Sequence, residues 1–136
     1  MSAVYLAGPS AELDRVREAA HLLRAAGHTI TEPWWERIEQ AKAAGWTSDA
    51  DVPPGFMRTS AERNYRGMLV ADFFVGLCRE TGGLSSGHAY EVGVAGEIMR
   101  PPCTRILVGE PRGFVGMWIG DVRVVPSVEA AMEIMR

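Results

Sequence analysis

One short segment of the chain combines a carboxylate, a histidine, two serines and two glycines. It reads Ser85-Ser86-Gly87-His88-Ala89-Tyr90-Glu91-Val92-Gly93-Val94-Ala95. The pattern predicts a helix that starts near Gly87 with Ser86 as its N-cap. Free backbone N–H groups at such a helix start favour anions and sugar oxygens. Glu91 would then lie just over one turn into the helix, near whatever these groups bind.

Glu91 is the strongest candidate for chemistry in this segment. Its same-face neighbours at helical spacing are Gly87, His88, Val94, Ala95 and Ile98. None of them is a lysine or arginine, so no local salt bridge accounts for the carboxylate. The helix is rich in glycine and alanine, which lets other elements come close. We expect Glu91 to be partly buried at a cleft, and an ordinary surface glutamate is the competing interpretation.

Apolar runs that alternate with helical patterns indicate which elements position this segment. The strands are expected at 4–7, 28–31, 72–78, 105–108 and 122–125. A helix capped by Ser10 should end at Gly27, and further helices are expected at 35–44, 59–71, 87–99 and 128–135, with a helical turn at 113–118. Pro101-Pro102 would stop the fourth of these helices. The fold class is therefore α/β: one flavodoxin-like or Rossmann-like domain with a five-stranded parallel sheet in the order 2-1-3-4-5.

Such sheets bind ligands at the carboxyl ends of their strands, where the strand order reverses. Two loops meet this rule, Gly8-Pro9-Ser10 after the first strand and residues 81–86 after the third. The long connection at 33–57 is predicted to be a lid or insert. Its Trp34 and Trp35 are candidates for stacking on an aromatic ligand, with packing against the core as the alternative.

Composition limits the classes of function. The chain has 136 residues, which suits a single domain over 1–136, and its net charge of −3 gives no basic excess for a nucleic acid polymer. No apolar run is long enough for a membrane span and no signal sequence precedes the first strand, so a cytoplasmic location is expected. Cys78 and Cys103 form no CxxC pair or Cys/His cluster, so neither structural zinc nor a disulfide framework is expected. No metal site and no cofactor are expected elsewhere in the chain.

Three motifs give the chain a family resemblance. They are Val4-Tyr5-Leu6-Ala7-Gly8-Pro9, then Ala71-Asp72, and then 86–95, which is similar to Ser-Gly-Thr-x-x-Glu-x-Gly-x-Ala. In order and spacing over about residues 3 to 130 the chain resembles the nucleoside 2-deoxyribosyltransferase family. That superfamily includes 2'-deoxynucleoside 5'-phosphate N-hydrolases and nucleotide N-ribosidases. The resemblance implies the fold derived above and a small nucleoside or nucleotide as substrate.

The resemblance also implies catalytic roles. The glutamate of the third motif, Glu91 here, would attack the anomeric carbon and form a glycosyl-enzyme ester, which a second base or water resolves. Tyr5 would orient the carboxylate, unless it is simply a core aromatic. Many members carry an aspartate where this chain has Asn64, and an amide cannot donate a proton as an acid does. His88 stands where threonine is common, as an alternative proton source or as a mere polar group.

Other departures concern the substrate. Ser85 replaces an aspartate of nucleoside-type members and, with Ser86 and the 8–10 loop, favours a 5'-monophosphate. Asp121 falls where a partner subunit reaches the 5' end, and its charge favours a nucleoside instead. Asp72 either touches the cleft or only orders its strand.

The resemblance implies a homodimer or a larger homo-oligomer. The run 117–119 is a candidate for its interface or for the core. A non-catalytic nucleotide-binding or sensing domain on the same fold is the alternative function. A receiver-like module fits less well, because Gly8-Pro9-Ser10 replaces an acidic cluster.

Overall fold

Five parallel strands form the sheet of the protein. A computed structural model describes residues 1–100, 104–112 and 115–136. The strands are β1 (Ala3–Ala7), β2 (Thr29–Ile30), β3 (Phe73–Leu77), β4 (Thr104–Val108) and β5 (Asp121–Val125). Their order is β2-β1-β3-β4-β5, with every neighbouring pair parallel. The predicted topology is thereby confirmed.

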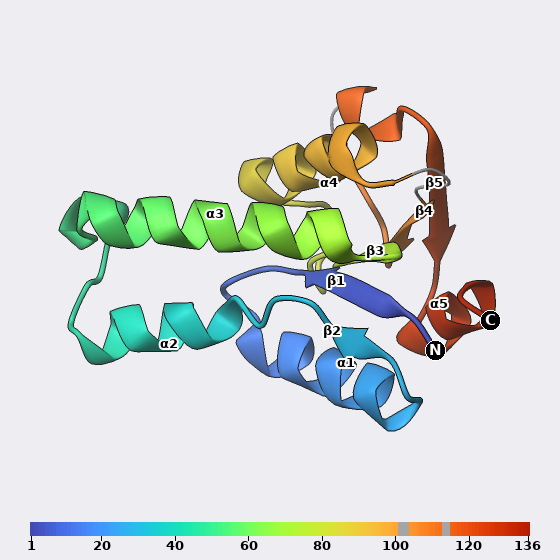
Figure 1. Cartoon of the computed structure of the whole chain (residues 1–136), viewed down its shortest axis with the longest axis horizontal. Coiled ribbons are helices and arrows are strands. Elements are labelled where there is room, and N and C mark those ends of the chain that lie inside the picture. The colour runs from blue at the N-terminus through green and yellow to red at the C-terminus, as the bar shows by residue number, and fades with distance from the viewer. Residues whose placement is uncertain (101–103, 113–114) are drawn as a thin grey trace.

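Helices cover both faces of this sheet (Figure 1). They are α1 (Leu13–Ala25), α2 (Trp35–Ala43), α3 (Pro54–Val70), α4 (Ser86–Ile98) and α5 (Val128–Ile134), with short 3-10 helices η1 (Asp49–Asp51) and η2 (Val115–Trp118). One core cluster joins the strands to α1 and α5, and a second joins them to α3 and α4. In the part of the chain that the structure describes, no helix has the length and apolarity to cross a membrane.

The alternation of side chains along β1 decides which residues face the candidate site. Val4 and Leu6 belong to the core cluster under α1, whereas Tyr5 belongs to the cluster under α3 and α4. The Tyr5 ring stacks on Phe74 of β3 with 5.6 Å between centroids. Because β1 is central and covered on both faces, Tyr5 is fully buried. Its hydroxyl therefore needs a partner within the protein.

Three helix starts differ from their predicted positions. Ser10 does not cap α1, because the chain turns once more and Glu12 takes the N-cap position. Ser85, rather than Ser86, caps α4, and its hydroxyl accepts a hydrogen bond from the His88 N–H at 3.2 Å. The third helix begins at Pro54 instead of residue 59, because the fixed backbone angle of proline suits the first turn of a helix.

Residues 33–57 fold into α2, η1 and the first turn of α3. Figure 1 shows α2 and α3 side by side, extending beyond the sheet and joined at their far ends. Trp46 and Phe56 meet there edge to face at 5.1 Å between centroids. Ser48 is the N-cap of η1, and Asp51 completes a capping box by accepting the backbone N–H groups of Thr47 and Ser48. The segment thus contains regular structure, and its role as a lid or insert stays a prediction. Pro101-Pro102, Cys103 and the start of the predicted 113–118 turn lie outside the described residues.

Candidate active site

The carboxylate of Glu91 meets the hydroxyl of Tyr5. Glu91 lies on α4, which follows β3, and Tyr5 lies on the neighbouring strand β1. The tyrosine O–H donates to Glu91 Oε2 at 2.6 Å. Within the described residues, Glu91 Oε1 has no hydrogen bond and the carboxylate has no salt bridge. Two residues 86 positions apart in the chain are thus paired as the resemblance implied, with one carboxylate oxygen left free.

The surroundings of Glu91 act on its charge in opposite directions. Burial raises the pKa of Glu91 above its usual range, while the Tyr5 hydrogen bond and the Arg37 guanidinium lower it. Burial is the largest of these effects. The pKa of Tyr5 is raised far above its ordinary value, first by burial and then by the charge of Glu91. Tyr5 therefore remains a protonated donor. Burial has removed part of the hydration that would stabilise the Glu91 carboxylate in water.

A buried ion pair near Tyr5 and Glu91 was not predicted from the sequence. Arg37 of α2 donates to Glu32 at 2.5 Å, and their residues are only 6% and 7% exposed. Arg63 of α3 reaches the same carboxylate at 3.2 Å. Glu32 lies two residues after β2 at the carboxyl edge of the sheet, so the rule that selected the 8–10 loop could have found it. Arg37 gave no such signal, because its place depends on how α2 packs.

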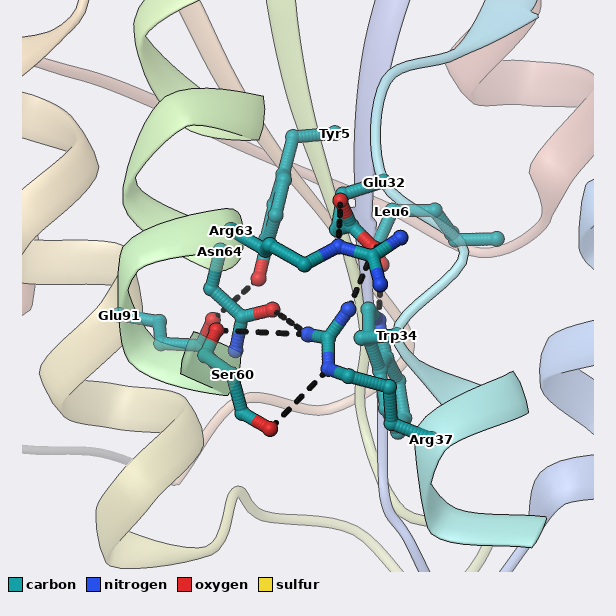
Figure 2. Close-up of polar contacts among 9 residues, drawn as sticks. All are labelled: Tyr5, Leu6, Glu32, Trp34, Arg37, Ser60, Arg63, Asn64 and Glu91. Atoms are coloured by element: carbon teal, nitrogen blue, oxygen red, sulfur yellow. Dashed lines mark hydrogen bonds and ion pairs between the residues drawn. The ribbon is translucent and has the colours of Figure 1, made fainter. Parts of the chain in front are cut away.

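Arg37 also connects the ion pair to Asn64 and Ser60 (Figure 2). One guanidinium nitrogen donates to Asn64 Oδ1, and Nε donates to Ser60 Oγ at 3.2 Å. The same nitrogen that contacts Asn64 lies 3.4 Å from the Ser60 carbonyl oxygen. Asn64 is thus held from one side by a fixed cation. Figure 2 shows these groups gathered with Tyr5 and Glu91 in one polar cluster.

A cavity of about 450 Å³ opens between α2 and α3 next to this cluster. Its lining is polar at Arg37, Ser60 and Asn64 and becomes aromatic toward Trp34, Trp46 and Phe56, and it further includes Ser10, Ala11, Ile38, Ala41, Lys42, Thr47, Ser48, Asp49, Val52 and Met57. The indole N–H of Trp34 donates to the Leu6 carbonyl at 2.6 Å, which fixes that ring beside β1. The size suits a small organic ligand.

The other predicted loop residues are placed unequally. Ser10 is exposed and lines the cavity, whereas Pro9 is buried. Gly8 packs toward α1, since a Cβ there would lie 2.8 Å from Val16 Cγ2. Gly87 is exposed with open space around it, and the Ser85 hydroxyl is used as the helix cap. Backbone at Ser86 and Gly87 begins α4, one turn before Glu91.

Two aromatic assignments are corrected by burial. Trp35 is 4% exposed, belongs to the core cluster with α1 and does not line the cavity, so its ring is not free to stack on a ligand. His88 is also 4% exposed, and its Nε2 has no hydrogen-bond partner among the described residues. Burial and then the nearby Arg79 charge lower the pKa of His88 to about 4. A neutral, enclosed imidazole is not a surface polar group, and a role for His88 as a proton source stays a prediction.

Two aspartates lie at the opposite edge of the sheet. Asp72 precedes β3 and accepts the Ala3 N–H at 2.9 Å, so it orders the start of β1 and does not touch the cavity. Asp121 begins β5, where it accepts the Thr104 hydroxyl at 2.8 Å and pairs with Arg123. Neither carboxylate is near Glu91 in its own chain, because the amino ends of parallel strands are remote from their carboxyl ends. A role for Asp121 toward a partner subunit stays a prediction.

The remaining predictions concern a metal and an interface. Over the described ranges, no group of three or more His, Cys, Asp or Glu side chains could hold a metal ion. Cys78 is a buried thiol, and burial raises its pKa to about 11. Met117 belongs to the core, whereas Trp118 and Ile119 are exposed and are the two of that run that could meet a partner.

The fold of this chain is similar to that of a solved enzyme structure. That enzyme is a 2-deoxyribosyltransferase from the psychrotolerant bacterium Bacillus psychrosaccharolyticus, with a TM-score of 0.64, 17% sequence identity, and coverage of 95% of this chain and 89% of that chain. No family model matches the sequence, and no curated protein matches it. At this identity the likeness shows a common fold, which agrees with the fold that the resemblance implied.

Proposed function

We propose that the chain is an enzyme that cleaves the N-glycosidic bond of a nucleoside or nucleoside 5'-monophosphate, with Glu91 as its nucleophile. The observation that carries the proposal is the 2.6 Å hydrogen bond from Tyr5 to the desolvated carboxylate of Glu91. This pair belongs to the polar cluster of Figure 2, whose Arg37, Ser60 and Asn64 line a ligand-sized cavity. The fold shared with a 2-deoxyribosyltransferase supports it. The reaction is base exchange or hydrolysis of a ribo- or deoxyribonucleoside compound.

The two carboxylate oxygens of Glu91 have different roles in this reaction. Tyr5 occupies Oε2, which leaves Oε1 to attack the anomeric carbon. As the new C–O bond forms, the C–N bond breaks and its electron pair leaves with the base. Water or a second base then attacks the same carbon, and Glu91 departs as a carboxylate. The negative charge of the Glu91 carboxylate, which the Tyr5 hydrogen bond stabilises, is thereby restored at the end of each cycle.

Replacement of Glu91 by glutamine tests the nucleophile. Gln keeps the size and the hydrogen bond with Tyr5 but cannot form a stable glycosyl ester, so base release should fall by roughly three orders of magnitude or more. Chromatography of free base from a panel of ribo- and deoxyribonucleosides and their 5'-monophosphates measures it. Glu97→Gln on the exposed face of α4 is the matched control and should retain activity. Full activity of Glu91→Gln would overturn the proposal.

Two further measurements separate the related outcomes. Incubation with and without an acceptor base distinguishes transfer from hydrolysis, and mass spectrometry of the trapped protein detects the Glu91 ester. The competing function is a non-catalytic nucleotide-binding domain, which Asn64 favours because the cavity's inner wall carries an amide in place of an acid. That function would give ligand-induced thermal stabilisation in both the native chain and Glu91→Gln, without release of base from any substrate.

A further inference from the structure

The Arg37 guanidinium determines how the Asn64 amide is oriented. Arginine offers only N–H donors, so the atom of Asn64 that faces it must be the oxygen Oδ1. The amide NH₂ group then points away from Arg37, as Figure 2 shows. Arg37 cannot easily turn aside, because Glu32 and Ser60 hold its other nitrogens. The NH₂ group is thus the part of Asn64, a residue of the cavity lining, that remains available as a hydrogen-bond donor.

Among the described residues that line the cavity, no acid is placed on α2 or α3 beside this donor. The one carboxylate of the described lining is Asp49, which is exposed on η1 at the far end of the α2–α3 insert. The other charged groups of the lining are the cations Arg37 and Lys42. Behind the wall, Glu32 is taken up by Arg37 and Arg63. Glu91 must itself be ionised to attack, and the Tyr5 hydroxyl is already donated to it.

We propose that the leaving base departs from this site as an anion, stabilised by the N–H of Asn64 and by the Arg37 charge behind it, and is not protonated by an acid of the protein. The inference rests on the proposed function and specifies its substrate class. When Glu91 Oε1 bonds to the anomeric carbon, the C–N electron pair remains on the ring nitrogen of the base. The base anion takes its proton from water after it leaves, so no proton is required from the protein in this step.

Anionic departure selects a chemical class of base. Lactam bases such as uracil and hypoxanthine spread the negative charge onto a carbonyl oxygen, which an amide N–H can bind. Cytosine and adenine leave readily only after a ring nitrogen is protonated, and this wall offers no acid for that purpose. We therefore expect nucleosides or nucleotides of lactam bases to be the substrates. Arg37 acts as a positioning residue, and Asn64 makes the contact with the base.

Substitution of Asn64 by aspartate reverses the polarity of the wall at constant size. Initial rates of base release are measured for matched uracil and cytosine compounds and for matched hypoxanthine and adenine compounds. The native chain should favour the lactam member of each pair by roughly tenfold or more, and Asn64→Asp should reduce that ratio by at least about tenfold. Gln40→Glu, which adds the same charge to an exposed position of α2, should leave the ratio unchanged. Equal rates in the native chain, or an unchanged ratio in folded Asn64→Asp, would overturn the inference.

A binding measurement keeps this inference separate from the proposed function. Calorimetry with 5-fluorouracil, an acidic lactam base, is carried out from below to above the pKa of that base. The affinity for 5-fluorouracil should increase as the base ionises. This increase in affinity should disappear in Asn64→Asp and persist in Gln40→Glu. If no substrate is cleaved but the increase is observed, the proposed function fails and recognition of the base anion holds. Binding that does not change as the base ionises refutes the inference whatever the catalytic result.

Arg37→Lys tests the positioning role. Lysine retains the charge opposite Glu32 but lacks the planar fork that holds Ser60 and Asn64 together. The amide can then rotate, so the lactam preference should fall by roughly tenfold while the variant keeps its fold by circular dichroism. An undiminished preference in this folded variant would show that Arg37 does not orient Asn64. If Arg37→Lys does not fold, the inference is tested by the Asn64→Asp rates and by the calorimetry, neither of which uses this variant.

Discussion

At the scale of single residues, the hydrogen bond from Tyr5 extends to lower pH the range in which Glu91 is ionised. Burial raises the pKa of Glu91 and the Tyr5 O–H lowers it, because the bond stabilises the carboxylate. In Tyr5→Phe the lowering contribution is lost, so the pKa of Glu91 should rise further. Since attack requires the carboxylate, base release should rise with pH through this pKa in both proteins, with the rise displaced to higher pH in Tyr5→Phe.

The pH–rate profile of base release measures this displacement, and a substrate of the proposed class is used for both proteins. At a pH below the rise, activity of Tyr5→Phe should be lower by roughly tenfold for each unit by which the pKa has moved. Tyr65→Phe removes a hydroxyl from an exposed tyrosine of α3 and should keep the native profile. An acidic limb at the same pH in Tyr5→Phe and the native chain would contradict the role given to Tyr5.

The same residues show how far the site could be predicted. The Tyr5–Glu91 hydrogen bond was implied by the family resemblance, and the structure contains it. Arg37 did not follow, because its contacts depend on the packing of α2 against α3 and not on a spacing. The sequence could not decide between the two interpretations of Trp35 for a related reason, and it did not predict the burial of His88. Residue type indicates that a ring can bind a ligand, but only packing shows that it is enclosed.

At the scale of elements, Gly67 allows α3 to pack closely against β1 and the segment after β2. A Cβ placed on Gly67 would lie 2.7 Å from Glu32 Cβ and 3.1 Å from Tyr5 Cδ2. Neither neighbour can move freely, because Glu32 is ion-paired and Tyr5 is in the core. The close approach that Gly67 permits also keeps Asn64, one turn earlier on α3, beside Arg37.

Two glycine-to-alanine substitutions in this one helix should therefore have opposite effects. Gly67→Ala should lower the free energy of unfolding by about 1–3 kcal/mol, because the added methyl overpacks the contact with β1. Gly55→Ala, at the first turn of α3 with nothing within 4 Å of the new methyl, should raise it by about 0.5–1 kcal/mol, since alanine favours helix. Urea unfolding followed by circular dichroism measures both. Equal changes of the same sign would contradict the packing described for α3.

Element existence was easier to predict than element ends. Each strand and each main helix was expected near its observed place, because apolar periodicity extends over many residues. The caps depended on single hydroxyls, and neighbouring serines could not be told apart: Ser85 caps α4 although Ser86 also fits the pattern. The start of α3 was missed because Pro53 and Pro54 indicate either a turn or the first turn of a helix, and the second applies here.

At the scale of the whole molecule, α4 packs onto the sheet partly through His88. The imidazole lies over Gly76 of β3, where an added Cβ would be 2.8 Å from Nε2, and beside Phe74. Its pKa is lowered to about 4 from the ordinary 6.5, first by burial and then by Arg79. The folded protein therefore keeps His88 neutral in a pH range where the unfolded chain protonates it. Acidification should act on the stability of the entire fold through this one group.

The sign of the effect follows from proton linkage. Between pH 6.5 and about 4 the unfolded state binds the proton more tightly, so the contribution of His88 is fully present above pH 6.5 and is lost as the pH falls toward 4. The loss amounts to about 3 kcal/mol across that window. His88→Leu removes the titrating group at similar volume and should flatten this part of the stability curve, as measured by urea unfolding at a series of pH values. His21→Leu on the exposed side of α1 should keep the native slope. If His88→Leu and the native chain lost stability in parallel over this window, His88 would have to be accessible to protons in the folded state, and α4 would not be sealed against β3 as described.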